Sequence, residues 1–147
     1  MTLRGSYSAR MDDRNRLKVP ADFRRHIEQA WGSDLFVTSL SGKDVHAYPI
    51  PVWEEFEARL LKRPIMDPAR MRIQKRVNYF GKTQSMDGQG RLLLHSPLKE
   101  EAGIGEEVMV LGYGNYLYVQ DASRLQQDVG ASIEADLETL SDLWRNE

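Results

Sequence analysis

The chain has 147 residues, no cysteine and a formal net charge of −2. The lack of cysteine excludes a disulfide framework and a thiolate metal site, and no apolar run approaches the roughly 18 residues that a membrane helix needs. We therefore expect a cytoplasmic protein without membrane contact, built as one ordinary domain or as two very small ones that share a core.

The charge is distributed unevenly along the chain. Seven cations against three acids give residues 1–25 a net charge of +4, and eight against one give residues 58–82 a net charge of +7. Residues 100–147 have two cations and eleven acids, which is −9. This asymmetry allows a nucleic-acid footprint on one region of a mildly acidic protein. The alternative is that these are solvated faces of opposite charge.

The first predicted element is a hairpin over residues 11–20, with the sequence MDDRNRLKVP. Asp12 can accept hydrogen bonds from backbone N–H groups two or three residues later. Asn15 tolerates a positive φ, which a tight turn before the second strand requires. Arg16, the first residue of that strand, can pair with Asp12 or reach outward as a fork of five donors.

Alternation along this strand separates an apolar side from a basic side. Leu17 and Val19 face one way, and Arg16 and Lys18 face the other. Such a hairpin fits phosphate contact and guanine readout. The candidate DNA-binding residues are the cations on or near it: Arg4, Arg10, Arg14, Arg16 and Lys18.

A helix, two strands and a second helix are predicted next. Phe23, Ile27 and Trp31 repeat at helical spacing over residues 20–31, and the following Gly32 is typical of a helix end. Strand-like runs at 35–38 and 45–48 flank a turn that contains glycine. The helix after them carries Trp53, Phe56 and Leu60 on one face.

A basic linker helix is predicted between the two halves. Asp67 is its expected cap and Pro68 its first-turn residue, with Ile73, Val77 and Phe80 on the apolar face. A solvated face is the simplest interpretation of its cations, which are Arg70, Arg72, Lys75 and Arg76. An acidic patch of another protein, or the acidic tail of another subunit, is the alternative.

The same order of elements then recurs, offset by 75 residues. Asp87, Gly90 and Arg91 stand where the first hairpin has Asp12, Asn15 and Arg16. Lys82 is the only cation close to this second turn in sequence, so we expect both turns to be structural and only the first to contact DNA.

The rest of the second copy is predicted from the same signals. Ser96 is the expected cap and Pro97 the first residue of a short helix that carries Leu98 and Ala102 and ends at Gly103 and Gly105. Strands follow at 108–111 and 116–119, and then a helix with Leu125 and Val129.

The final predicted element is an acidic amphipathic helix. Its apolar positions are Ile133, Leu137, Leu140 and Trp144, which must face the chain's own core, a neighbouring subunit or a partner.

The duplicated pattern predicts an α+β, β-rich fold of two pseudo-symmetric half-domains that form one compact unit. The expected units are a first half-domain at 6–53, a helical linker at 54–81, a second half-domain at 82–125 and the acidic C-terminal helix at 126–147.

At these residues the sequence resembles the MraZ family of bacterial transcriptional regulators. The similar stretches are residues 4–7, 12–20, 48–49, 53–54 and 87–91, within a region that covers roughly residues 3–125. The resemblance implies two SpoVT/AbrB-like half-domains with swapped hairpins, and a ring-shaped homo-oligomer. It also implies binding to short direct repeats of double-stranded DNA in the promoter of the division and cell-wall gene cluster, usually as a repressor of its own operon. Arg16 corresponds to the family's DNA-binding arginine, and a location at the nucleoid follows.

An enzyme and a protein-interaction module are the two alternatives to DNA binding. The three histidines, His26, His46 and His95, lie in different predicted elements without ligand or triad spacing, and neither a Gly-x-Ser-x-Gly motif nor a phosphate-binding glycine loop occurs. We therefore expect no enzyme activity, no metal and no cofactor. A non-catalytic protein-interaction module remains the alternative, because one fold can serve several functions.

Overall fold

The computed structural model describes residues 2–131 and 133–145, and it repeats one order of elements twice. The first half contains β1 (Ser6–Arg10), β2 (Arg16–Lys18), α1 (Ala21–Ala30), β3 (Asp34–Thr38), β4 (Val45–Pro49) and α2 (Ile50–Leu61). After α3 (Pro68–Phe80), the second half contains β5 (Lys82–Ser85), β6 (Arg91–Leu93), α4 (Ser96–Glu101), β7 (Glu107–Gly112), β8 (Leu117–Asp121) and α5 (Ala122–Val129). A short 3-10 turn, η1 (Glu134–Asp136), and α6 (Leu137–Arg145) complete the described chain. The predicted β-rich α+β fold with two repeated halves is confirmed.

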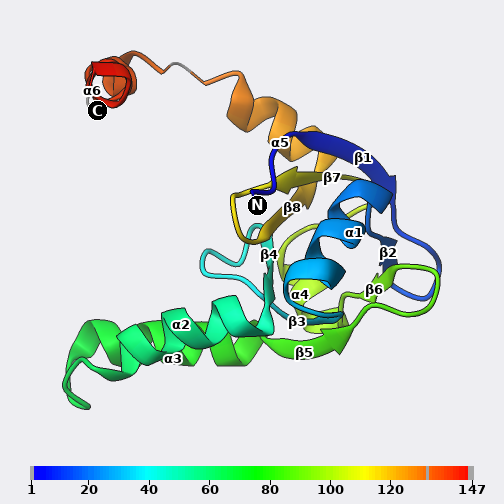
Figure 1. Cartoon of the computed structure of the whole chain (residues 1–147), viewed down its shortest axis with the longest axis horizontal. Helices are drawn as coiled ribbons and strands as arrows, with labels where there is room; N and C mark the ends of the chain where they lie inside the picture. The colour runs from blue at the N-terminus through cyan, green and yellow to red at the C-terminus, as the bar shows by residue number, and fades with distance from the viewer. Residues whose placement is uncertain (1, 132, 146–147) are drawn as a thin grey trace.

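The two halves interleave within one antiparallel sheet. Its six strands run in the order β1-β7-β8-β4-β3-β5, and β2 and β6 form a separate two-stranded ribbon (Figure 1). The first strand of each half pairs with the third strand of the other half: β1 pairs with β7, and β5 pairs with β3. Exchanging the halves maps this strand order onto itself, which is the pseudo-symmetry expected of a duplication.

The core is shared between the halves. Leu17 of β2 lies opposite Leu92 of β6, and each side chain is only 1% exposed. Ile27 of α1 and Leu98 of α4 are also buried in this same cluster. Because each half supplies the surfaces that bury the other, neither half has a complete core of its own.

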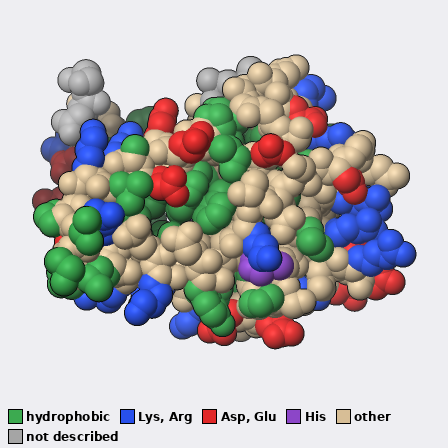
Figure 2. Space-filling view, turned by 90° about the horizontal axis from the view of Figure 1, so that it is seen from below, with side chains coloured by type: hydrophobic (Ala, Val, Ile, Leu, Met, Phe, Trp, Pro, Cys, Tyr) green, Lys and Arg blue, Asp and Glu red, His purple; other side chains and the backbone are tan. Residues whose placement is uncertain are grey.

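Helices α2 and α3 form an arm, which we call the helical arm (residues 50–80), that projects from the sheet (Figure 1). As predicted, Asp67 caps α3 by accepting a hydrogen bond from the N–H of Ala69, and Pro68 opens the helix. At the root, the Thr38 hydroxyl donates to the carbonyl oxygen of Val77 at 2.7 Å. Figure 2 shows hydrophobic and basic side chains side by side over the outer part of the arm.

The start of the fourth helix differs from its prediction. His95, not Ser96, occupies the cap position, and it makes no side-chain cap bond. The reason is the repeat itself: His95 stands 75 residues after Pro20, which occupies the cap position of α1 in the same extended conformation. Both helices therefore begin at the same position of the repeat, with two residues between the strand and the helix.

The acidic C-terminal helix expected over 126–147 is divided. Residues 126–129 complete α5, Gly130 follows as its C-cap, and α6 begins only at Leu137. Residues 132 and 146–147, which the sequence places in this helix, lie outside the described residues. No helix in the described part of the chain has both the length and the apolar character needed to cross a membrane.

Candidate nucleic-acid interface

The turn between β1 and β2 is held by the side chain of Asp12. Its Oδ1 accepts hydrogen bonds from the N–H groups of Arg14 (2.9 Å) and Arg16 (2.8 Å), and its Oδ2 accepts one from Nε of Arg16 at 2.8 Å. Asn15 has φ +60°, so the positive φ predicted from the sequence is confirmed. The backbone donors lie two and four residues after the aspartate.

The second turn repeats this geometry. Asp87 Oδ1 accepts from the N–H groups of Gln89 (2.8 Å) and Arg91 (2.9 Å), and Oδ2 accepts from Nε of Arg91 at 2.8 Å. Gly90 has φ +77°, matching Asn15. Both turns thus fix the first arginine of the following strand through Nε.

These hydrogen bonds keep both aspartates charged. The backbone N–H of Arg91 is the largest influence on Asp87 and, with the Arg91 side chain, lowers its pKa to about 2 against the opposing effect of burial. For Asp12, burial acts to raise the pKa, but the hydrogen bonds from Arg16 and Arg14 outweigh it and the pKa is lowered. Each turn therefore carries a stable Asp–Arg ion pair.

The register of the ribbon places cations from both halves on one face. Arg16 lies opposite Leu93, and Lys18 lies opposite Arg91. Because side chains alternate along a strand, these four residues share the outer face, which we call the ribbon face, while Leu17 and Leu92 point into the core. The terminal guanidinium nitrogens of Arg16 and Arg91 and the ammonium of Lys18 have no partner among residues 2–131 and 133–145. They are available to an external ligand.

Two cations support the turns from the opposite halves, and sequence reasoning missed both. Arg24 of α1 donates through Nη2 to the carbonyl oxygens of Asp87 (3.4 Å) and Gly88 (3.1 Å) in the second turn. Lys99 of α4 donates through Nζ to Oδ1 of Asn15 at 2.9 Å in the first. Arg24 and Lys99 occupy equivalent positions of the repeat, 75 residues apart. Aligning the two halves of the sequence would have shown a cation at this position in both.

Lys82 is the only close cation along the sequence, but the expectation that no other cation lies near the second turn is wrong in space. Arg24 contacts the turn, and Lys18 lies across the ribbon from Arg91. The physical reason is the interleaving of the halves, which brings together residues more than 60 positions apart.

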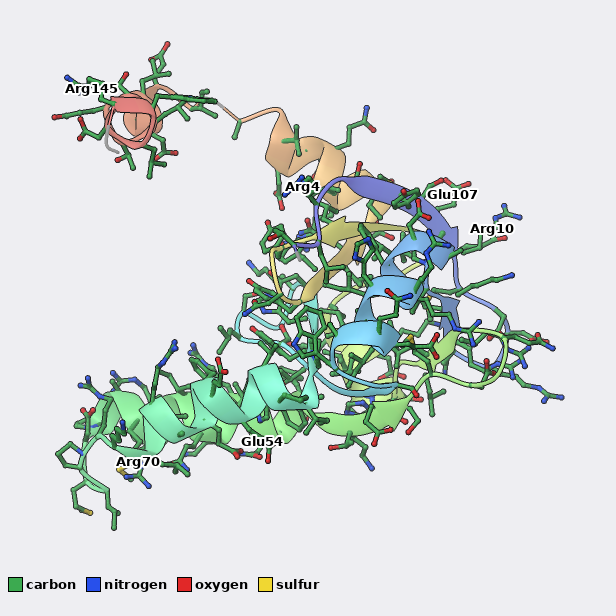
Figure 3. All side chains as sticks on the ribbon, viewed as in Figure 1. Arg4, Arg10, Glu54, Arg70, Glu107 and Arg145 are labelled. Carbon is green, nitrogen blue, oxygen red and sulfur yellow. The ribbon has the colours of Figure 1, made fainter. Side chains whose placement is uncertain are left out.

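The remaining predicted DNA-binding residues lie before β1, at its end and in the turn that follows it. Arg14 is exposed at the first turn, beside the ribbon face. Arg10 is also exposed, but it pairs with Glu106 at 3.3 Å and with Glu107 at 3.9 Å. Arg4 precedes β1 and lies at its other end (Figure 3), on the order of 20 Å away along an extended strand. The structure thus gathers Arg14, Arg16 and Lys18, and it separates Arg4 from them.

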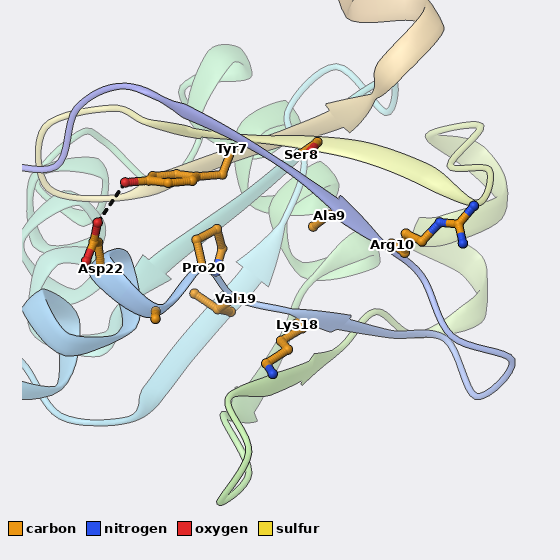
Figure 4. Close-up of a pocket in the computed structure, with 9 residues that line it drawn as sticks. Tyr7, Ser8, Ala9, Arg10, Lys18, Val19, Pro20 and Asp22 are labelled. Carbon is orange, nitrogen blue, oxygen red and sulfur yellow. Dashed lines mark hydrogen bonds between the residues drawn. The ribbon is translucent and has the colours of Figure 1, made fainter.

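Two grooves flank Lys18. One of about 480 Å³ lies between β1 and the segment from Lys18 to Asp22, where the Tyr7 hydroxyl donates to Oδ2 of Asp22 at 2.8 Å (Figure 4). The other, of about 390 Å³, is lined by Arg24 and Arg25 of α1 as well as by Lys18. The basic edge of the ribbon face is therefore open to a ligand from both sides.

The histidines lie in three separate elements. His26 is on α1, His95 precedes α4, and His46 on β4 has its Nδ1 2.7 Å from the Tyr48 hydroxyl. Within the described ranges, no group of three or more histidine, aspartate or glutamate residues is placed to hold a metal ion.

Comparison with known proteins identifies relatives over almost the whole chain. The model of the family described as "MraZ protein, putative antitoxin-like" matches residues 81–142. The transcriptional regulator MraZ of Koribacter versatilis is 43% identical over 143 residues, which cover 95% of this chain and 97% of that protein. The protein of the same name from Acidobacterium capsulatum is 41% identical over 126 residues, 86% of each chain. That from Tolumonas auensis is 32% identical over 98% of this chain and 97% of its own.

Proposed function

The chain belongs to the MraZ family, and we propose that it is a sequence-specific DNA-binding transcriptional regulator. The observation that carries this proposal is the ribbon face, where Arg16, Lys18 and Arg91 converge from two strands with their donors unpaired among the described residues. Relatives named as transcriptional regulators support the same function.

The shape and chemistry of the ribbon suit double-stranded DNA. The major groove admits a two-stranded β-ribbon, and an arginine fork can donate two hydrogen bonds to one guanine. With its Nε fixed by Asp12, Arg16 can present only its terminal nitrogens outward. Lys18 and the exposed Arg14 at the turn then serve as phosphate contacts that set the register on the duplex.

The finer proposal concerns the target and the assembly. We infer that the chain forms a ring-shaped homo-oligomer at the nucleoid and represses its own division and cell-wall gene cluster by binding short direct repeats in the promoter. One ribbon face offers only three cations, so a single contact is weak. Several ribbons on a tandem array of boxes would bind tightly, because the second and later contacts are intramolecular.

The decisive experiment is a gel shift with DNA from upstream of the chain's own gene. Arg16→Ala should abolish specific binding and leave the oligomer unchanged in size-exclusion chromatography, because the guanidinium acts at the surface. Arg4→Ala is the matched control. The sequence made Arg4 a DNA-binding candidate, but it lies at the end of β1 far from the ribbon face, so we now propose that this variant binds normally. Arg91→Ala should weaken binding less than Arg16→Ala, since Gln89 and Leu93 stand where the first hairpin has Arg14 and Lys18.

Normal binding by Arg16→Ala would refute the proposal. In that case the non-catalytic interaction module becomes the better hypothesis, and the exposed apolar residues of the helical arm, such as Ile65 and Met66, are the surface that favours it.

A further inference from the structure

The outer face of α3 combines exposed apolar and basic side chains. Met71, Lys75 and Tyr79 follow one another at a spacing of four residues, and Tyr79 is 70% exposed. Arg72 and Arg76 flank them. At the C-terminal end of this face lies a pocket of about 430 Å³. Its lining residues are Leu40, Ser41, Lys75, Arg76, Tyr79, Phe80 and one acid, Glu101, which forms no ion pair with either cation. We call this surface the α3 face.

The cations of the α3 face are uncommitted. Arg63 and Arg70 are occupied within the arm, where Arg63 pairs with Asp67 and Arg70 donates to the carbonyl oxygen of Arg63 at 2.6 Å. By contrast, the side chains of Arg72, Lys75 and Arg76 make no ion pair or hydrogen bond with the described part of the chain. A ligand for this face must therefore supply negative charge as well as apolar contact.

The C-terminal helix has the complementary properties. Leu137, Leu140 and Trp144 lie on one face of α6, and Trp144 is 82% exposed. Glu138 and Asp142 lie on another face of the same helix. Every described residue from 126 to 145 is exposed, and Figure 1 shows α6 standing away from the sheet.

A helix of this kind requires a partner. α6 has nine residues, and isolated helices shorter than about 12 residues are marginal in water unless an amphipathic face is packed. Among the described residues α6 contacts η1, the turn directly before it, but Leu137, Leu140 and Trp144 all remain exposed. We therefore look for the stabilising contact outside the described chain.

We propose that α6 of one chain docks on the α3 face of a second copy of this chain. Trp144 and the neighbouring leucines cover Met71 and Tyr79 and reach the pocket beside Leu40, and the acids of α6 meet Lys75 and Arg76. DNA would satisfy the cations of the α3 face but would leave Met71 and Tyr79 without an apolar partner, whereas α6 supplies both kinds of contact.

A second copy fits better than the chain's own arm. Only residues 130–133 connect α5 to η1, so the ends of the two elements can lie at most about 17 Å apart. α5 packs on β7 and β8, while α2 of the arm packs on β3 and β4. Figure 1 accordingly shows α5 and α6 at the top of the molecule and the arm at the bottom.

Cross-linking between differently labelled chains tests the proposal, because the chain has no cysteine of its own. A chain carrying Ser141→Cys, beside the apolar face of α6, is mixed with a chain carrying Asn78→Cys, at the edge of the α3 face, and treated with a bifunctional maleimide. We expect a covalent product of two different chains. Thr139→Cys, on the opposite side of α6, is the matched control and should give much less product.

Charge reversal adds a second readout. Lys75→Glu with Arg76→Glu should lower the yield of the mixed product, and Glu138→Lys in the α6 donor should restore part of it. Circular dichroism and size-exclusion chromatography of each variant establish that the chain is folded. The yield should also fall at high salt, since exposed charges are then screened.

Three results would overturn the proposal. A cross-link that forms only inside a chain carrying both cysteines would assign α6 to its own arm. Equal yields for Ser141→Cys and Thr139→Cys would show random collision. Complete loss of DNA binding by the Lys75→Glu, Arg76→Glu chain, with its oligomer size unchanged in size-exclusion chromatography, would assign the α3 face to DNA.

Discussion

At the residue scale, Asp12 and Arg16 show how one pair serves both a turn and a surface. The carboxylate takes Nε of Arg16 and two backbone N–H groups, and so closes the turn. The terminal guanidinium nitrogens remain unpaired in the described structure. From the sequence, Arg16 could either pair with Asp12 or reach outward. In this geometry it does the first through Nε and remains able to do the second through its terminal nitrogens.

Asn15 and Gly90 solve the same backbone problem with different side chains. Both have a positive φ, which costs an ordinary L-residue roughly 1–2 kcal/mol and glycine almost nothing. The asparagine amide offers a compensation that glycine cannot, since its Oδ1 accepts a hydrogen bond from Lys99 of the other half. Asparagine in place of glycine thus adds a hydrogen bond between the two halves at the first turn.

The depressed pKa of Asp87 makes stability depend on pH. Its folded-state pKa of about 2 lies below the value of roughly 3.9 for an unfolded chain. The charged carboxylate therefore stabilises the fold above about pH 4, and this contribution is lost as the pH falls towards 2. Asp87→Asn should be less stable than the parent chain at pH 7, and the difference should shrink between pH 4 and 2 in urea unfolding.

Asp13→Asn is the control, because the Asp13 side chain has no hydrogen-bond partner in the described chain. A difference between Asp87→Asn and the parent that stays constant from pH 7 to pH 2 would contradict the assignment of a charge-dependent role.

At the scale of elements, the two three-residue strands of the ribbon are too short to be stable alone. A hairpin or strand pair needs a packed apolar face to persist in water. Leu17 and Leu92 provide it, one from each half and directly opposite one another. The basic outer face is positioned by the burial of the inner one.

Leu17→Ala should therefore destabilise the whole chain by about 2–5 kcal/mol, the range for a buried leucine that leaves a cavity. Leu93→Ala removes the same atoms from the outer face, where the side chain is 39% exposed, and should cost less than about 1 kcal/mol. Urea unfolding of both variants measures the difference. Similar losses for the two would show that the inner face of the ribbon does not anchor it.

Local patterns in the sequence predicted the elements better than their contacts. Apolar spacing at Phe23 and Ile27 predicts α1, and the Asp87 to Arg91 motif predicts a turn with a left-handed residue. Periodicity carries no information about which strand pairs with which. The contact of Arg24 with a turn 63 residues away depends on the interleaving, and only the repeat offset hints at it. The helix with Leu125 and Val129 and the final amphipathic helix were predicted as separate elements, but the expected unit boundary at residue 126 falls inside α5, because apolar spacing alone does not show where a helix ends.

At the scale of the whole molecule, the charges are segregated in space as well as in sequence. The ribbon face and the helical arm together carry half of the 20 cations, while half of the 22 acids lie in residues 100–147. The net charge of −2 therefore hides a basic surface large enough to attract a polyanion locally. An acidic tail docked on the arm would leave the ribbon face as the main exposed basic surface of an assembly.

This segregation, with the proposed oligomer, determines how DNA binding should respond to salt. Each ribbon face contributes Lys18, and its turn contributes Arg14, so several subunits on one promoter would neutralise several phosphates together. A complex with six or more phosphate contacts loses roughly a thousandfold or more in affinity between 50 and 200 mM salt.

Gel shifts across this range should show a steep linear fall of log affinity with log salt. Lys18→Gln, which removes one cation per subunit without touching the turn, should make that slope shallower. A flat dependence, or a slope unchanged by Lys18→Gln, would contradict phosphate contact through the ribbon face and would favour a partner other than nucleic acid.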